Sequence, residues 1–115
     1  MSAIVYPGWP SCAKAVIEHE FDTDHLSVWL TFSDSMNILK VPLITDFVPF
    51  LDNVVKAFAT IEWIDHYTLL LTIADVGSLP DRVLIDFPYP VQNLVTYYGK
   101  QWEPWADILS IDITT

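Results

Sequence analysis

The chain has 115 residues, of which 52% are hydrophobic and 14% are aromatic, and its formal net charge at pH 7 is −10. This length favours a single domain, and the apolar content excludes a disordered tail. Only five Lys and Arg residues accompany fifteen Asp and Glu residues, and the cations are scattered singly along the sequence. Nucleic acids and anionic membrane surfaces both require clustered positive charge, so we expect neither as a partner.

Cys12 is the only cysteine, which excludes an intramolecular disulfide and therefore a secreted cystine scaffold. The N-terminus shows no basic stretch followed by an apolar run, and no apolar segment approaches the ~20 residues that span a bilayer. We therefore expect a protein that is made in a cytoplasm without a signal peptide.

The first ten residues predict an extended arm. Pro7, Gly8 and Pro10 prevent a regular helix and pairing within a central strand. Large apolar side chains are unusual in a free tail, so the arm is expected to lie either on its own domain or on a neighbouring subunit, and we favour the neighbour. The side chains expected to make this contact are Ile4, Val5, Tyr6 and Trp9.

The segment after the arm predicts a β-hairpin. Residues 14 to 20 alternate weakly between apolar and polar, and residues 26 to 32 alternate clearly. Asp22-Thr23-Asp24 supplies a turn between them, because Asp side chains hydrogen-bond to the nearby backbone. The apolar face of the second strand consists of Leu26, Val28, Leu30 and Phe32.

The middle of the chain fits two structures. After a polar loop, a short strand broken by Pro42 is expected over residues 40 to 44. Residues 46 to 59 fit either a helix with Asp46 as its N-cap or a hairpin that turns at Asp52-Asn53, with Pro49 at an edge position. The periodicity favours the helix, whereas the resemblance described below favours the hairpin, which we adopt. The helical stripe would consist of Phe47, Phe50, Leu51, Val54 and Phe58.

Further strands are expected towards the C-terminus. Residues 61 to 64 and 67 to 73 form a second pair around a turn at Asp65-His66. Another strand covers residues 82 to 87 and is stopped by Pro88. Several short strands separated by turns are typical of a β-sandwich. The last strand is expected over residues 108 to 113, with Ile111 and Ile113 on one face and Ser110 and Asp112 on the other.

The order of these signals resembles the Ig-like repeats of bacterial surface and adhesin-type proteins. The LTLTF-S strand that opens such a repeat is matched by residues 26 to 34, which read Leu-Ser-Val-Trp-Leu-Thr-Phe-Ser-Asp. The other elements of the repeat follow in the same order. Residues 47 to 53 match its F-x-V strand and polar turn, and residues 61 to 73 match its TLTLTL pair. Residues 81 to 87 match its D-x-V-x-V-x-F strand, and Asn93-Leu94 together with residues 99 to 105 match its closing segment.

The resemblance implies an all-β fold, a single Ig-like antiparallel β-sandwich over residues 11 to 115 with the extended arm over residues 1 to 10. The chain departs from the repeats because it holds one copy, lacks an export signal and is rich in Trp and Pro. Single Ig-like domains without a signal are familiar in tailed-phage virions. The resemblance therefore implies a bacteriophage virion component, such as a decoration, neck, baseplate or fibre module, with other virion proteins as partners and homo-oligomeric assembly as one expectation.

The residues supply no recognisable active site, so we expect neither an enzyme nor a bound cofactor. There is no Gly-rich phosphate loop, paired cysteine, His-Glu-x-x-His helix or nucleophile elbow. Four alternating carboxylates near the first turn could bind calcium, and the alternative is a solvated edge that discourages aggregation. His19 and His25 beside them could ligate zinc, although residues around a turn are normally solvated. The four carboxylates are Glu18, Glu20, Asp22 and Asp24.

Aromatic residues are too numerous for one small core. Trp29 and Trp63 lie in the middle of expected strands, and one of them is expected in the sandwich core. The loop over residues 97 to 105 either folds back onto its own core or contacts a partner, because Tyr and Trp concentrate at interfaces. A third interpretation has flat aromatic rings stacking on sugars. The loop residues expected at an interface are Tyr97, Tyr98, Trp102 and Trp105.

The preferred hypothesis is a non-enzymatic structural or interaction protein that attaches to a virion through the arm and the aromatic loop. The alternative is a carbohydrate- or host-receptor-binding module that uses exposed Trp residues, with Trp102 and Trp105 as the candidates.

Overall fold

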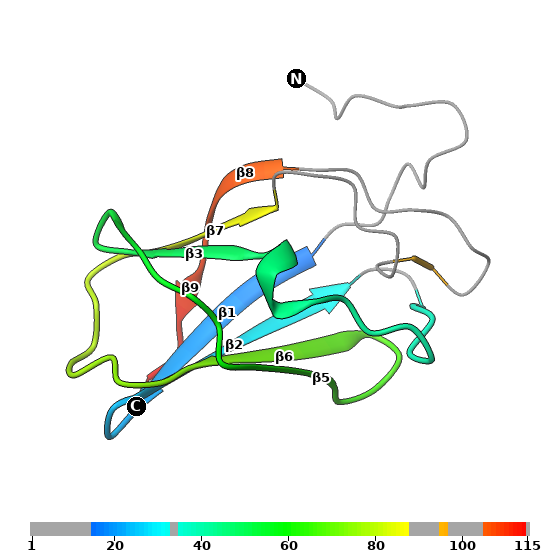
Figure 1. Cartoon of the computed structure of the whole chain (residues 1–115), viewed down its shortest axis with the longest axis horizontal. Coiled ribbons are helices and arrows are strands. Elements are labelled where there is room, and N and C mark those ends of the chain that lie inside the picture. The colour runs from blue at the N-terminus through cyan, green and yellow to red at the C-terminus, as the bar shows by residue number, and fades with distance from the viewer. Residues whose placement is uncertain (1–14, 33–34, 88–94, 97–104, 115) are drawn as a thin grey trace.

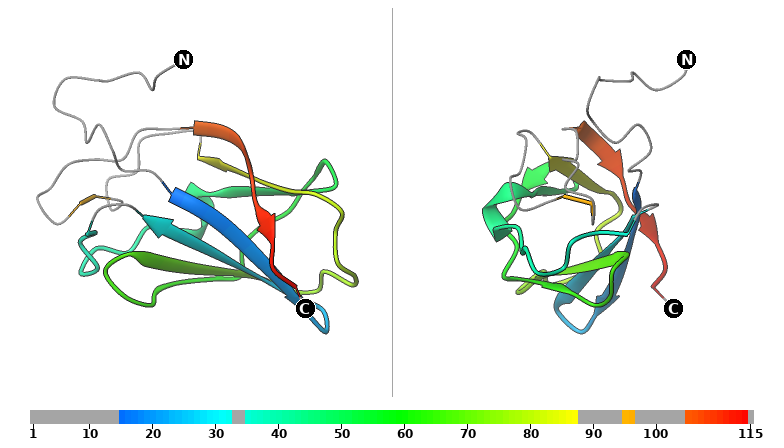
Figure 2. Two further views of the ribbon diagram at one scale, coloured as in Figure 1. Left: turned by 180° about the vertical axis from the view of Figure 1, so that it is seen from behind. Right: turned by 90° about the vertical axis from the view of Figure 1, so that its right-hand side faces the viewer.

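A computed structural model of the chain describes residues 15–32, 35–87, 95–96 and 105–114. This part of the chain forms nine strands, and its buried residues form one core cluster. The strands are arranged in two sheets (Figures 1 and 2). The described part of the chain contains no α-helix and one short 3₁₀ helix, η1 (Ile44–Asp46), none of it able to cross a membrane as a helix. The fold is an all-β sandwich, as predicted. The strands are β1 (Ala15–Asp22), β2 (His25–Phe32), β3 (Val48–Leu51), β4 (Val54–Val55), β5 (Thr60–Trp63), β6 (Thr68–Ile73), β7 (Val83–Phe87), β8 (Trp105–Leu109) and β9 (Ile111–Asp112).

The C-terminal end of the chain contributes one strand to each sheet. The larger sheet has the strand order β5-β6-β2-β1-β9, and the smaller sheet has the order β4-β3-β7-β8. All neighbouring strands are antiparallel except β1 and β9, which are parallel. Only Ser110 separates β8 from β9, so the chain passes from the smaller sheet to the larger one at this residue (Figure 2).

The core lies between the sheets and is built by alternation along each strand. On β2 the four predicted apolar residues are each at most 2% exposed, which confirms the predicted face. On β6 it is Leu69, Leu71 and Ile73 that are buried. Trp63 at the end of β5 packs against this core, and its ring centroid lies 5.7 Å from that of Phe32. Trp29 is half-buried on the opposite face of the sheet, so Trp63 is the tryptophan that meets the core.

The first predicted hairpin is confirmed. β1 and β2 pair along their whole length, from Ala15 with Phe32 to Asp22 with His25. The two-residue turn between them places Thr23 at a φ of 61°. A β-branched residue seldom adopts this left-handed conformation, so the register of the hairpin is kept at a local cost in the turn.

Residues 46 to 59 form the predicted hairpin rather than the helix. β3 and β4 are joined by a turn at Asp52-Asn53, whose φ angles are 52° and 69°. Positive φ at both central positions is typical of a type I′ turn, and Asp and Asn tolerate this region better than most residues. Antiparallel pairing of all of β3 with β7 supplies hydrogen bonds that a helix would forgo. Tertiary pairing therefore decides between two patterns that the sequence alone leaves open.

Pro49 lies in β3 where its missing N–H costs no hydrogen bond of the sheet. Its carbonyl oxygen accepts a hydrogen bond from the Lys56 N–H at 2.9 Å. A strand residue directs its nitrogen and its carbonyl to the same side, so the nitrogen of Pro49 also faces Lys56, beyond the end of β4 (Val54–Val55). The position resembles a sheet edge because the neighbouring strand has ended there.

The second predicted pair is confirmed with a longer connection, and one predicted strand is wrong. β5 and β6 pair from Thr60 with Thr72 to Trp63 with Leu69, and a loop over residues 64 to 67 joins them. No strand forms over residues 40 to 44. Instead the Lys40 carbonyl accepts a hydrogen bond from the Trp63 Nε1–H at 2.9 Å, and η1 begins at Ile44.

The predicted strand over residues 108 to 113 is also wrong, because the chain divides at Ser110 into strands of two different sheets. The Ser110 N–H donates to the Val83 carbonyl at 2.9 Å, whereas the Ile113 N–H donates to the His19 carbonyl at 2.9 Å. The burial is opposite to what hydrophobicity suggests, since Ser110 is 6% exposed and Ile111 is 55% exposed. The polar partners of Ser110 explain this inversion.

Candidate interaction surface

The residues predicted to form an interface lie almost entirely outside the described part of the chain. This applies to Ile4, Val5, Tyr6, Trp9, Tyr97, Tyr98 and Trp102. Trp105 is the exception, because it begins β8 and its backbone pairs with Phe87 of β7. The arm and the aromatic loop therefore stay predictions. The surfaces that the structure does describe are the outer faces of the two sheets.

An apolar row crosses the outer face of the smaller sheet. Val83 and Ile85 of β7 belong to the core, so Leu84 between them points to the opposite, outer face. Directly paired residues on antiparallel strands share a face, and Leu84 pairs with Phe50 of β3 on one side and with Leu109 of β8 on the other. Phe50 in turn pairs with Val55 of β4. This outer apolar row, Val55–Phe50–Leu84–Leu109, spans all four strands.

Exposure changes along the outer apolar row. Leu84 at its centre is 8% exposed and Phe50 is half-buried, whereas Val55 and Leu109 at its ends are 58% and 59% exposed. In an antiparallel sheet with one face in solvent, the residues along each strand normally alternate, and those on the solvent side are polar. An apolar residue at every position across one face is the pattern expected of a surface that meets another surface.

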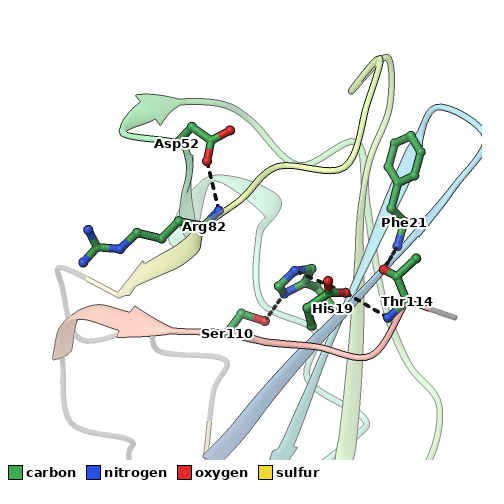
Figure 3. A network of polar contacts seen from close by, with 7 residues as sticks. His19, Phe21, Asp52, Arg82, Ser110 and Thr114 are labelled. Atoms are coloured by element: carbon green, nitrogen blue, oxygen red, sulfur yellow. Dashed lines mark hydrogen bonds and ion pairs between the residues drawn. The ribbon is translucent and has the colours of Figure 1, made fainter.

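Charges of both signs flank the outer apolar row. The alternate positions before and after Leu84 are Arg82, which directly precedes β7, and Asp86 within β7. The Asp52 carboxylate accepts a hydrogen bond from the Arg82 backbone N–H at 2.9 Å, and the Arg82 side chain extends away from it (Figure 3). The turn at Asp52-Asn53 is thus tied to the start of β7, which helps to hold the register of the row.

The outer face of the larger sheet has a different composition. Strand pairing aligns one row across its five strands, in the order Glu62, Leu70, Trp29, Glu18 and Ile111. Trp29 is half-buried at the centre of this acidic row, between Leu70 and Glu18, and Glu62 lies beyond Leu70. Hydroxyl-bearing residues occupy the neighbouring rows, namely Ser27 with Thr72 and Thr31 with Thr68. None of the described Lys and Arg residues lies on these strands.

A polar cluster fastens the C-terminal strand to β1. His19 is 3% exposed, its Nδ1 lies 2.7 Å from the Ser110 Oγ, and its Nε2 lies 3.8 Å from the Asp112 Oδ1 (Figure 3). Burial lowers the pKa of His19, and the nearby Asp112 carboxylate opposes this only in part. Hydrogen bonds from the Thr114 side chain and backbone lower the pKa of Asp112, with the Thr114 N–H at 2.8 Å from Oδ1.

The His19 cluster combines the residue types of a serine hydrolase but not their geometry. The Asp112 carboxylate is beyond hydrogen-bond distance of the imidazole, and the Ser110 side chain is buried. With a neutral imidazole, the Ser110 hydroxyl donates to Nδ1 and the Nε2–H faces Asp112. This arrangement supports a structural role, in which the cluster satisfies buried polar atoms where the chain changes sheets.

The carboxylates predicted as a calcium site do not converge with the histidines. Glu18 and Glu20 lie on the outer face, whereas His19 points inward to Ser110. The Asp24 carboxylate contacts the exposed His25 ring at 2.7 Å. Among the described residues no group of three or more His, Cys, Asp or Glu side chains is placed to hold a metal ion.

Two surface hollows are lined by described residues. One is lined mainly by apolar residues around η1 and β3, including Phe47, Val48 and Phe58. Another lies beside the β3–β4 turn, between Asp52, Lys56 and Ser78. Neither contains the His19 cluster, so the only buried Ser-His pair described here is not joined to either hollow.

No known protein family matches this sequence, and no curated protein resembles it.

Proposed function

We propose that this protein is a non-enzymatic interaction module that is built into a larger assembly, and that the assembly is a bacteriophage virion. The observation that carries the first part is the outer apolar row, Val55–Phe50–Leu84–Leu109. The exposed ends of this row, Val55 and Leu109, gain nothing from being apolar unless another surface removes them from water. The virion setting comes from the resemblance to single Ig-like domains.

The chemistry of the described residues agrees with a non-enzymatic role. The one place where Ser, His and Asp side chains meet is buried and links strands to each other. The arm residues (Ile4, Val5, Tyr6, Trp9) and the loop residues (Tyr97, Tyr98, Trp102, Trp105) are proposed as further contacts with virion proteins.

Sedimentation of a native lysate tests assembly. An antibody against the chain is used to follow it through a density gradient of the phage or cell lysate that contains it. We expect it to sediment with particles far larger than its own mass of 13.1 kDa. Recovery solely at the position of a free small protein overturns the proposal. Activity against ester or glycoside substrates that is lost with Ser110→Ala, in a variant that stays folded, overturns its non-enzymatic part.

One observation favours a second candidate, a glycan-binding module. Trp29 lies on the outer face of the larger sheet between Glu18 and Leu70, with Ser and Thr hydroxyls in the adjacent rows. Aromatic faces stack on the apolar side of sugar rings, while carboxylates and hydroxyls bind sugar hydroxyls. The expected result is a signal on a glycan array that Trp29→Ala removes, while Leu109→Ala, on the outer face of the other sheet, retains it. An array without signal for the wild type rejects this candidate.

A further inference from the structure

Two outer faces are available for association, and their charges differ. The acidic row on the larger sheet presents Glu18 and Glu62, and Glu20 lies one row away on the same face of β1. A second copy presenting the same face would bring these carboxylates against each other, and like charges brought together from water repel. The larger sheet is therefore unsuited to contact with its own copy.

The smaller sheet is suited to contact with its own copy. Its outer apolar row carries no charge, and the charged residues on either side of Leu84 have opposite signs, with Arg82 directly before β7 and Asp86 within it. Consider two copies that face each other and are related by a two-fold axis parallel to the row. The strands of the second copy then run in the opposite direction to those of the first. Arg82 of one copy then faces the partner's Asp86, and Leu84 faces the partner's Leu84.

We propose that two copies of the chain associate face to face through the outer faces of their smaller sheets, in a contact that covers the exposed Val55 and Leu109 and the half-buried Phe50. This inference rests on the proposed function as an interaction module and names a second copy as the partner. The arrangement is a closed, self-complementary dimer, which is the commonest symmetry of soluble oligomers. Two sheets that pack in this way interdigitate their side chains about 10 Å apart.

The size of the face sets the expected strength. Four strands spaced by about 4.8 Å give a row only about 15 Å long. Such a face supplies less than the roughly 800 Å² per partner of a standard interface. The dimer is therefore expected to form reversibly as the protein concentration rises.

The test uses the full chain and light scattering over a wide range of concentrations. The wild-type mass is expected to rise from that of one chain to that of two. Leu109→Glu places a charge at the exposed end of the outer apolar row and is expected to abolish this rise. Ile111→Glu is the matched control, because Ile111 is similarly exposed, lies two residues away, and belongs to the other sheet. It is expected to dimerise like the wild type.

A second pair of variants guards against misfolding of the C-terminal strands. Val55→Glu alters the opposite end of the row, and Val16→Glu alters a valine of similar exposure on β1. Only Val55→Glu is expected to remain monomeric, and circular dichroism verifies that each variant is folded. Dimers that tolerate both Leu109→Glu and Val55→Glu overturn the proposed face.

The lysate gradient separates failure of this inference from failure of the proposed function. A wild-type chain that stays monomeric at every concentration, yet sediments with large particles in its native lysate, overturns the second-copy inference alone. A chain that is monomeric in both experiments overturns both.

Discussion

At the scale of single residues, His19 shows how a buried polar group can stabilise a change of sheet. Its imidazole lies between Ser110 and Asp112, and its backbone carbonyl accepts the Ile113 N–H. All three partners belong to the last few residues of the chain. The cluster is most stable with a neutral imidazole, because burial of His19 disfavours its charged form.

The first prediction concerns pH. The pKa of His19 in the folded protein lies below its ordinary value of 6.5, chiefly because of burial. Below pH 6.5 the unfolded chain therefore binds more protons than the folded chain, and stability is lost as the pH falls from 6.5 towards the folded pKa. His19→Gln is expected to lower the free energy of unfolding near neutral pH by about 1–3 kcal/mol and to remove this part of the pH dependence.

Urea unfolding at a series of pH values measures the effect. Carboxylate protonation relieves repulsion in a chain of net charge −10, so the wild type alone does not isolate one histidine. The difference between wild type and His19→Gln removes that shared contribution, and the exposed His66 supplies a control in His66→Gln. Identical slopes for wild type and His19→Gln would show that His19 is not the titrating group.

At the scale of the element, the turns carry the local strain. Thr23 has a φ of 61° in a two-residue hairpin turn, where glycine adopts positive φ at no steric cost. Thr23→Gly is expected to raise the free energy of unfolding by about 1 kcal/mol, because the left-handed penalty of a side chain disappears. The small exposed hydrogen bond from Thr23 Oγ1 to Asp22 Oδ1, at 3.3 Å, offsets little of this gain.

A second Thr→Gly variant shows whether the change in the free energy of unfolding at Thr23 comes from its positive φ. Thr31→Gly changes an exposed threonine within β2, where extended backbone suits a β-branched residue. It is expected to lower stability by about 0.5–1 kcal/mol. Thermal unfolding of both variants measures the contrast, and loss of stability in both would contradict relief of strain at Thr23.

The elements that the sequence predicts well are those formed by neighbouring segments. The β1–β2 and β5–β6 pairs follow from alternation of period two and from turn residues, and both are local in the chain. The division at Ser110 does not follow from any local pattern, because it depends on hydrogen bonds to Val83 and His19, far away in the sequence. Isoleucines on either side of Asp112 instead favour one continuous strand.

The outer apolar row could not be predicted for a related reason. Val55, Phe50, Leu84 and Leu109 become neighbours only through the strand order β4-β3-β7-β8. Leu84 lies between two core residues, so the sequence shows a short apolar run and not the face to which each side chain points. The aromatic segments are recognisable in the sequence by their unusual composition. This row is not, because it consists of residue types that are common in any core.

At the scale of the whole molecule, the outer faces of the two sheets differ in composition. The larger sheet presents acidic residues around Trp29, and the smaller sheet presents the outer apolar row. The net charge of −10 makes separate copies repel each other. At an ionic strength of about 0.1 M, salt screens this repulsion at separations beyond about 10 Å. Contact through the smaller sheet is thus expected to strengthen as the ionic strength rises, unlike an association held by ion pairs.

The last prediction concerns the arm. The described core begins at Ile17 and both sheets are assembled by strands from Ala15 onward, so deletion of residues 1 to 10 is expected to leave the sandwich folded. Assembly into the proposed virion is expected to weaken, because the deletion removes the proposed contact side chains Ile4, Val5, Tyr6 and Trp9. Thermal unfolding measures the fold, and competition of tagged full-length and shortened chains for incorporation into particles measures assembly. Equal incorporation would show that the arm makes no contribution, whereas a large fall in the unfolding temperature would assign the arm to its own domain.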